Sequence, residues 1–169
     1  MKEANGWRWL SLTAAIVLAD QLSKQAILDN LMPYESVFVW PVLDITHVYN
    51  TGVAFSFFAG AGGWQRWAFV ALALGISAAI VVWLRRLQAR SQWLLACALS
   101  LVLGGALGNA VDRIKLGHVV DFVHVHWKDA SFPAFNVADA AITVGAVLLL
   151  LDAFFDGRRK QGKRASPAG

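Results

Sequence analysis

The chain has 169 residues, of which 57% are hydrophobic and 15% are charged, and its formal net charge is +4. This composition is too apolar for a soluble domain of this length, so we expect one membrane domain covering residues 1–169. The basic residues flank apolar stretches instead of forming a patch with interleaved aromatic residues, which argues against nucleic acid as a partner.

Four apolar segments approach the roughly 20 residues that a helix needs to cross a bilayer. The first contains the uncharged run Trp9 to Ala19 and carries Asp20 and Lys24 toward its far end. In the last, the only charged residue before Asp152 is Asp139. We therefore expect an all-α membrane protein with four transmembrane helices, at about residues 7–28, 66–85, 91–112 and 136–155.

The basic residues predict the orientation of these spans. Ten of the fifteen Lys and Arg residues lie near the N-terminus, between the second and third spans, or in the tail 156–169. Since basic residues accumulate on the cytoplasmic side, we expect both termini there, with residues 29–65 and 113–135 facing outward. A cleavable secretory signal is the alternative for the first segment, but Asp20 and Lys24 occupy the place of a small-residue cleavage site.

The outward segments are predicted to form a small β element near the membrane surface. Val37 to Tyr49 is rich in β-branched and aromatic residues, and Pro41 within it indicates an edge or a bend, so we expect a strand or hairpin. Gly117 to Trp127 is predicted to be a strand. Alternation along this strand would point Asp121 to the opposite face from His118, His124 and His126.

Asp121 and Asp139 each interrupt an apolar stretch, where an unpaired carboxylate would be costly. Ionisable groups at membrane depth usually face a protein interior or a wet cavity and indicate function. Two carboxylates that converge on one site cannot both ionise easily, so they can share a proton around an attacking water, as in aspartic proteases. The alternatives are that Asp139 caps the N-terminus of a helix and that Asp121 is a solvated strand residue.

Other chemistries have weaker support. The histidines near Asp121 would point away from it on a strand, and no HExxH motif is present, so no metal is expected. A helix there would instead place Asp121 and His124 on one face and favour a metal. The sequence has no G-x-S-x-G motif, and its only cysteine, Cys97, lies within the third span as a small buried apolar residue. No cofactor is expected.

Further polar residues lie at the outer ends of the spans. Asp20 and Lys24 have the i, i+4 spacing of an ion pair on one helix face. Asn109, Asp112 and Arg113 cluster at the end of the third span. We expect Arg113 to be a structural cation, paired with Asp112, or a clamp for a peptide carbonyl or a lipid headgroup.

Two spacings indicate how the spans pack and where their polar residues lie. Gly104 and Gly108 have the small-xxx-small spacing that permits close helix approach. Asn136 precedes Asp139 by three residues, which places both on one face of the fourth helix, near the outer surface.

A second class of function is a small proton-coupled carrier, and a third is a non-catalytic lipid-binding assembly factor. A carrier can hold carboxylates in its spans, but carriers usually bind their substrates near the membrane midplane, whereas these polar residues cluster at the outer ends of the spans. Asp152 follows Asp139 by 13 residues, or roughly 20 Å along a helix, so it cannot join the same site.

Five motifs carry a resemblance to a known family: DQLSK from Asp20, NTGVAFSF from Asn50, GGALGNAVDR from Gly104, GHVVDF ending at Phe122 and FNVAD ending at Asp139. Together and in this order, they resemble the lipoprotein signal peptidases, also called type II signal peptidases. The resemblance implies a four-span aspartic peptidase of the bacterial inner membrane. Such an enzyme cleaves the signal peptide from diacylglyceryl-modified prolipoproteins just before the lipidated cysteine.

The resemblance also implies roles for individual residues. Asp121 and Asp139 match the catalytic aspartates of the family. The positions that line or support its site are matched by Asn50, Gly52, Asn109, Arg113 and Asn136, with Asp20, Lys24, Asp112 and Gly108 as further supporting residues. Val53 departs from the Ala that the family more often has there. The expected partners are the lipidated prolipoprotein and membrane lipid, and the expected state is a monomer with its site near the outer surface.

The segment from Asn50 to Phe57 is expected to cover this site, excluding water and gripping the substrate beside the cysteine. This expectation rests on its outward position and its apolar character.

Overall fold

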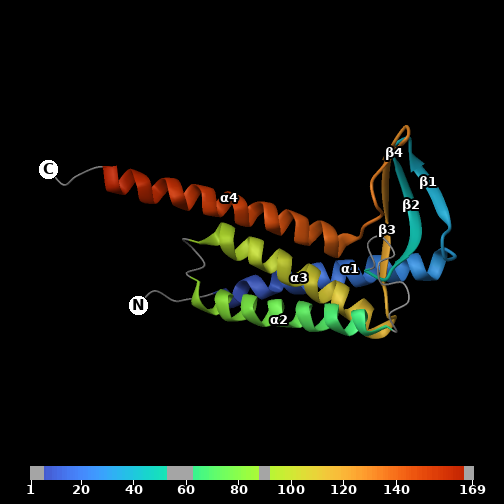
Figure 1. Cartoon of the computed structure of the whole chain (residues 1–169), viewed down its shortest axis with the longest axis horizontal. Coiled ribbons are helices and arrows are strands. Elements are labelled where there is room, and N and C mark those ends of the chain that lie inside the picture. The colour runs from blue at the N-terminus through green and yellow to red at the C-terminus, as the bar shows by residue number, and fades with distance from the viewer. Residues whose placement is uncertain (1–5, 53–62, 88–91, 166–169) are drawn as a thin grey trace.

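The computed structural model describes residues 6–52, 63–87 and 92–165 of the chain. Four long helices lie side by side along the longest axis, and a small antiparallel sheet crosses one end of them (Figure 1). The elements in chain order are η1 (Gly6–Trp9), α1 (Leu10–Asn30), β1 (Ser36–Trp40), β2 (Leu43–Asn50), α2 (Trp64–Arg86), α3 (Trp93–Lys115), β3 (Val119–Trp127), β4 (Ala130–Ser131) and α4 (Val137–Ala165).

Three of these helices are long and apolar enough to cross a membrane: α2, α3 and the Val137–Phe155 part of α4. Their outer surfaces expose large apolar side chains, as lipid-facing helices require; these include Leu72, Leu74, Ile76 and Val82 on α2 and Val144, Val147, Leu150 and Leu151 on α4. The predicted spans near 66–85, 91–112 and 136–155 therefore correspond to these three helices. The segment predicted as the first span forms α1, which is 21 residues long but is not among the three.

The helix α3 is the centre of the bundle, since it packs against α1, α2 and α4. Glycines bring the backbones together, as their spacing predicted. An added Cβ at Gly104 would lie 2.8 Å from Cβ of Ile16 on α1, and one at Gly108 would lie 2.6 Å from Oδ2 of Asp20. Real side-chain carbons do not approach this closely, so only glycine allows α1 to sit here.

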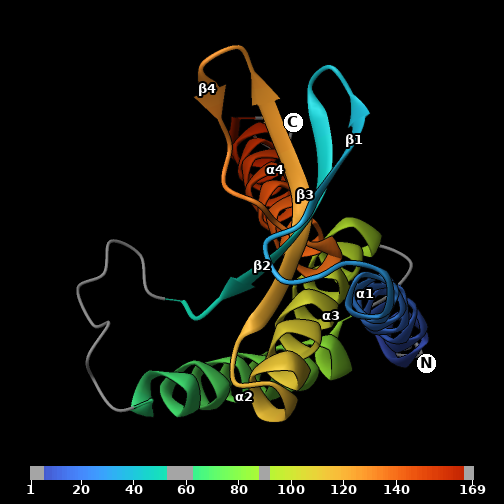
Figure 2. The same cartoon turned by 90° about the vertical axis from the view of Figure 1, so that its right-hand side faces the viewer.

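The sheet has the strand order β1-β2-β3-β4, and neighbouring strands are antiparallel. The predicted hairpin and the predicted strand are both confirmed, as β1–β2 and β3. The register pairs Val48 of β2 with Asp121 of β3, after an irregularity between Ile45 and Val48. Figure 2 shows β2 and β3 crossing the end of the bundle, with the hairpin tips extending beyond it. This crossing carries the first residues of β3 to α1 and α3 and to Asn136, just before α4.

Candidate active site

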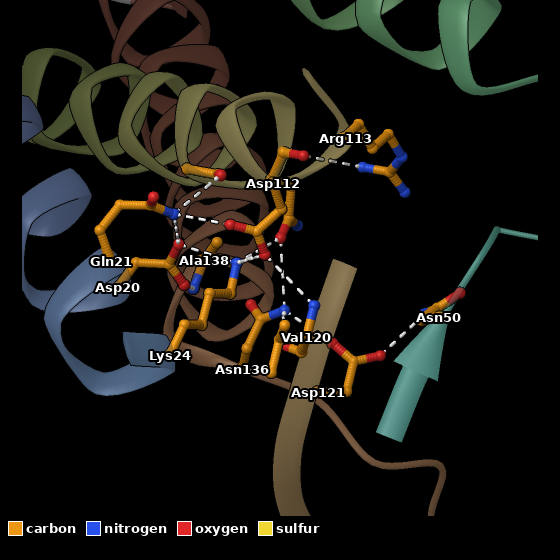
Figure 3. A network of polar contacts seen from close by, with 12 residues as sticks. Asp20, Gln21, Lys24, Asn50, Asp112, Arg113, Val120, Asp121, Asn136 and Ala138 are labelled. Atoms are coloured by element: carbon orange, nitrogen blue, oxygen red, sulfur yellow. Dashed lines mark hydrogen bonds and ion pairs between the residues drawn. The ribbon is translucent and has the colours of Figure 1, made fainter. Parts of the chain in front are cut away.

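Polar side chains gather where the sheet meets the helix ends (Figure 3). The helix α1 contributes Lys24, α3 contributes Asp112, β3 contributes Asp121, and Asn136 precedes α4. All four side chains are buried. Buried polar groups are tolerated only when they are paired, so the contacts of this cluster define what it can do.

Lys24 is the centre of a buried ion network. Its Nζ lies 2.8 Å from Oδ2 of Asp20 and 2.9 Å from Oδ2 of Asp112, and the three side chains are at most 4% exposed. The predicted Asp20–Lys24 pair is confirmed. Asp112 pairs with this lysine rather than with the adjacent Arg113, because α1 and α3 lie in close contact at this level.

The two carboxylates of this network also accept hydrogen bonds from the backbone. Oδ1 of Asp20 accepts from the N–H of Ala138, 2.9 Å away in the first turn of α4, and Oδ2 of Asp112 accepts from the N–H of Val120 at 3.2 Å. A carboxylate at a helix N-terminus is favoured by the helix dipole. The network therefore joins α1, α3, β3 and α4 into one frame.

Gln21 is a member of this frame that the sequence did not single out. Its Nε2 donates to Oδ1 of Asp112 at 2.8 Å and lies 3.3 Å from Oδ2 of Asp20. The available signal was its place in the DQLSK motif, between two residues that were singled out.

Asn136 ends the loop before α4 and caps that helix. Its Oδ1 accepts a hydrogen bond from the N–H of Asp139 at 2.9 Å, while its own N–H lies 3.4 Å from Oδ2 of Asp139. This reciprocal pairing satisfies N–H groups that a helix start leaves without partners. Asp139 thus takes part in the helix cap, as the alternative interpretation proposed, but it has a second contact that a cap does not need.

That second contact is with Asn109 of α3. Nδ2 of Asn109 donates to Oδ1 of Asp139 at 2.7 Å. Oδ1 of Asn109 accepts from Nζ of Lys24 at 3.0 Å and lies 3.3 Å from Nδ2 of Asn136. The ion network therefore holds the amide that orients Asp139.

Asp121 is buried on β3, with an exposed fraction of 2%, so its interpretation as a solvated strand residue is wrong. Its Oδ1 accepts from Nδ2 of Asn136 at 2.7 Å, and its Oδ2 accepts from Nδ2 of Asn50 at 2.8 Å. Burial raises the pKa of Asp121 from 3.8 to about 6, the hydrogen bond from Asn50 opposes the rise, and the charge of Asp139 adds to it. Asp121 therefore keeps its proton to a higher pH than an ordinary carboxyl.

Asn50 and Gly52 form a turn beside Asp121. Oδ1 of Asn50 accepts from the N–H of Gly52 at 2.8 Å, which leaves Nδ2 to donate to Asp121. Gly52 has φ +79°, a conformation that favours glycine. Val53 and the remainder of the segment expected to cover the site, up to Phe57, lie outside the described residues.

Arg113 projects from the end of α3 toward the same region (Figure 3). Its Nη1 lies 3.4 Å from the carbonyl oxygen of Asn109, and its guanidinium carbon lies 5.0 Å from the ring centroid of Phe69. The charges of Asp139, Asp112 and Asp121 all act on it. Among the described residues it forms no direct ion pair, so its N–H donors remain oriented by weaker contacts.

The histidines have other partners. His126 Nε2 lies 3.1 Å from Oδ2 of Asp44, with His124 beside it, and His118 packs on the ring of Tyr49 at 4.1 Å. Burial lowers the pKa of His118. Within residues 6–52, 63–87 and 92–165, no group of His, Cys, Asp or Glu is arranged to hold a metal ion. The cysteine of α3, Cys97, is half-buried rather than buried as expected.

Comparisons with known proteins agree with this architecture. Residues 12–155 match the family described as signal peptidase (SPase) II. Proteins named lipoprotein signal peptidase from Pseudomonas fluorescens and Shewanella pealeana are 54% and 51% identical to the chain. These alignments cover 88% and 91% of this chain and 87% and 90% of the relatives.

Solved structures show the same fold. One bacterial membrane enzyme aligns with a TM-score of 0.79 and 28% identity, covering 96% of this chain and 94% of its own. A second aligns with a TM-score of 0.75 and 30% identity, covering 85% and 90%. The matches place this chain in the class of membrane peptidases. More specifically, it belongs to the signal peptidase II family.

Proposed function

We propose that this chain cleaves signal peptides from prolipoproteins as an aspartic endopeptidase, with Asp121 and Asp139 as its catalytic pair. Cleavage of prolipoprotein signal peptides follows from its family. The observation that carries the aspartic mechanism is that one side chain, Asn136, contacts both carboxyl-bearing residues: Nδ2 donates to Asp121, and Oδ1 accepts from the backbone of Asp139. This shared contact supports the proposed pairing of the two residues.

The raised pKa of Asp121 supports a division of roles within the pair. In the free enzyme the shared proton resides on Asp121, whose pKa is near 6. Asp139, which receives the amide hydrogen bond of Asn109, is assigned the role of general base. Asp139 takes a proton from the attacking water, and Asp121 donates its proton toward the peptide carbonyl oxygen. The C–N bond of the tetrahedral intermediate then breaks, the leaving amine takes the proton that Asp139 received from water, and the hydroxyl proton returns to Asp121.

Arg113 is the proposed partner of the developing oxyanion. Its guanidinium lies close enough to feel the charges of both Asp121 and Asp139. Nδ2 of Asn136 is already occupied by Asp121, so Asn136 holds the acid while Arg113 contacts the substrate. A cationic donor in a site that excludes water stabilises negative charge strongly.

We propose α1 as a fourth membrane span, completing the four-span arrangement. At 21 residues it is about 31 Å long, which matches the hydrocarbon core. Asp20 and Lys24 are 0% and 2% exposed because they face the bundle, whereas Leu18 and Leu22 are about 60% exposed and face outward. The polar residues therefore do not meet lipid.

The membrane orientation follows from the basic residues. Arg8 lies in η1, and Arg85 and Arg86 lie in the last turn of α2, both at the end of the bundle opposite the sheet (Figure 1). Basic residues there support a cytoplasmic location for that end. The sheet and the aspartates then lie at the outer surface. A prolipoprotein with its acyl chains in the outer leaflet would present its scissile bond at this depth, just before the diacylglyceryl cysteine.

The test is cleavage of a diacylglyceryl-modified prolipoprotein by the purified full chain in detergent, with EDTA present. Wild type is compared with Asp121→Asn and Asp139→Asn. Asp152→Asn is the matched control, since it changes the same residue type on α4 about 20 Å from Asp139. Thermal unfolding of each variant verifies its fold.

We expect wild type and Asp152→Asn to cleave before the lipidated cysteine in EDTA, and both other variants to bind substrate without turnover. Turnover at the wild-type rate in either Asp121→Asn or Asp139→Asn would contradict the proposed aspartic mechanism. Loss of wild-type activity in EDTA, restored by a metal ion, would point to a metallopeptidase instead.

A further inference from the structure

Phe69, in the second turn of α2, contacts two parts of the candidate active site that come from different elements. Its ring lies beneath the guanidinium of Arg113 on α3, with a distance of 5.0 Å from the Arg113 Cζ to the ring centroid. The ring edge also packs against Gly52, which follows β2. Sequence patterns did not single out Phe69, because an aromatic residue in an apolar span has no signature of its own.

The contact with Gly52 leaves no room for a side chain. A Cβ added at Gly52 would lie 2.7 Å from Cε2 of Phe69, closer than real side-chain carbons approach. The N–H of Gly52 in turn holds Oδ1 of Asn50 at 2.8 Å, and this orients Nδ2 of Asn50 toward Asp121. The Asn50–Gly52 turn therefore packs directly against the ring of Phe69.

The Phe69 ring is one of two contacts that restrain the Arg113 guanidinium among the described residues. The one hydrogen bond that Arg113 makes there, to the carbonyl oxygen of Asn109, is long at 3.4 Å. A guanidinium over an aromatic face is attracted by the ring quadrupole, and the attraction grows when the site is desolvated. The face of Phe69 thus sets the direction in which the Arg113 donors point.

Neighbouring side chains on α2 do not share this position. Trp67 is 56% exposed, and its ring stacks with Arg66 instead, at 4.8 Å. Leu72 is 60% exposed on the lipid side. Phe69 is half-buried and turned toward the site, so it is more than a lipid-facing residue of the span.

We propose that Phe69 is a positioning residue for peptide cleavage: it aims the Arg113 guanidinium at the substrate carbonyl and fixes the Asn50–Gly52 turn that holds Asp121. This inference rests on the proposed aspartic mechanism and assigns Phe69 no contact with the reacting atoms. It predicts that an apolar residue of similar size without an aromatic face cannot replace it.

The test uses Phe69→Leu in the full chain, assayed on a diacylglyceryl-modified prolipoprotein in detergent. The expected result is a fall in kcat of roughly three- to thirtyfold with little change in KM, since a cation–π contact in a desolvated site has that magnitude. A selective loss in kcat is typical of an interaction made in the transition state. The fall of kcat/KM at high pH should also shift to higher pH. A looser turn weakens the hydrogen bond from Asn50 that lowers the pKa of Asp121.

Two comparisons separate positioning from simple packing. Phe69→Tyr keeps the aromatic face and should retain most of the activity. Trp67→Leu makes the same kind of change two residues earlier on α2, at the ring that holds Arg66, and should leave kcat and the pH profile as in wild type. Thermal unfolding in detergent verifies that each variant folds.

A double-mutant cycle with Arg113→Gln completes the test. If Phe69 acts through Arg113, Phe69→Leu should lower kcat much less in the Arg113→Gln background than in wild type. Equal losses in both backgrounds, or wild-type kcat in Phe69→Leu, would overturn the inference. Asp121→Asn and Asp139→Asn in the same assay test the proposed catalytic pair separately. Activity in either variant would contradict the pair, whatever the result for Phe69.

Discussion

The side-chain amide of Asn136 donates a 2.7 Å hydrogen bond to the buried carboxyl of Asp121. The same residue caps α4 and so fixes the place of Asp139, three residues further on. One side chain therefore both caps α4 and contacts both members of the proposed catalytic pair. The contacts around this residue, and around the helices that support it, lead to five predictions.

A substitution can separate the two functions of Asn136: capping α4 and donating a hydrogen bond to Asp121. Asn136→Ser keeps a residue that caps helices well but removes the Nδ2 donor to Asp121. We expect thermal unfolding within a few degrees of wild type and cleavage lowered by roughly 10²- to 10³-fold, the size of effect seen when one positioned donor is lost. Ala134→Ser, two residues earlier, is the control. Full activity in Asn136→Ser would show that the hydrogen bond to Asp121 is dispensable.

The pKa of Asp121 predicts the pH dependence of cleavage. In the proposed mechanism Asp121 must be protonated, and its pKa is near 6, so kcat/KM should fall as the pH rises above about 6. Asn50→Ala removes a hydrogen bond that lowers this pKa, so the fall should move to higher pH. Thr51→Ala, at the exposed neighbouring residue, should leave the profile unchanged. A shift of the Asn50→Ala profile to lower pH would contradict this account.

The same pKa has a consequence for stability. The folded-state pKa of Asp121 is raised above its unfolded value, so the folded state binds this proton more tightly. Its contribution to stability is fully present below pH 3.8 and is lost as the pH rises toward about 6. Asp121→Asn should therefore reduce the change in thermal unfolding temperature across this window. An unchanged pH dependence in the variant would assign the effect to other groups.

Lys24 is predicted to contribute strongly to the stability of the fold. Lys24→Met leaves Asp20 and Asp112 buried without their shared cation, which in other proteins costs about 3–5 kcal/mol. We expect a large drop in the thermal unfolding temperature. Adding Asp112→Asn to Lys24→Met should recover part of this loss by removing one uncompensated charge. Gln25→Ala, on the exposed side of α1, is the control and should change stability little.

Two glycines in different helices should respond oppositely to alanine. At Gly105 of α3 an added Cβ would lie 2.6 Å from Cγ1 of Ile142 and would press on the backbone of Ala138, so Gly105→Ala should destabilise by about 1–3 kcal/mol. At Gly75 of α2 a Cβ meets nothing within 4 Å, so Gly75→Ala should be neutral or stabilise by up to about 1 kcal/mol. Denaturation of both variants in the same detergent measures the difference. Equal effects would contradict the close packing of α3 on α4.

Much of the fold could be predicted from the sequence, because its signals are local. Apolar stretches near the length of a bilayer crossing predicted α2, α3 and α4, and β-branched runs predicted the β1–β2 hairpin and β3. The Gly104 spacing predicted close helix contact, and the i, i+4 spacing predicted the Asp20–Lys24 pair. Each of these depends on neighbours within a turn or a strand.

The sequence by itself determined the elements and the chemical groups; the tertiary structure decided which groups meet. Asp112 pairs with Lys24 across 88 residues rather than with adjacent Arg113, and Asp121 is buried between Asn50 and Asn136 rather than solvated. Gln21 and Phe69 join the site although no pattern marked them. The physical reason is that side-chain networks depend on how closely helices and strands approach, and those approaches involve residues far apart in the chain.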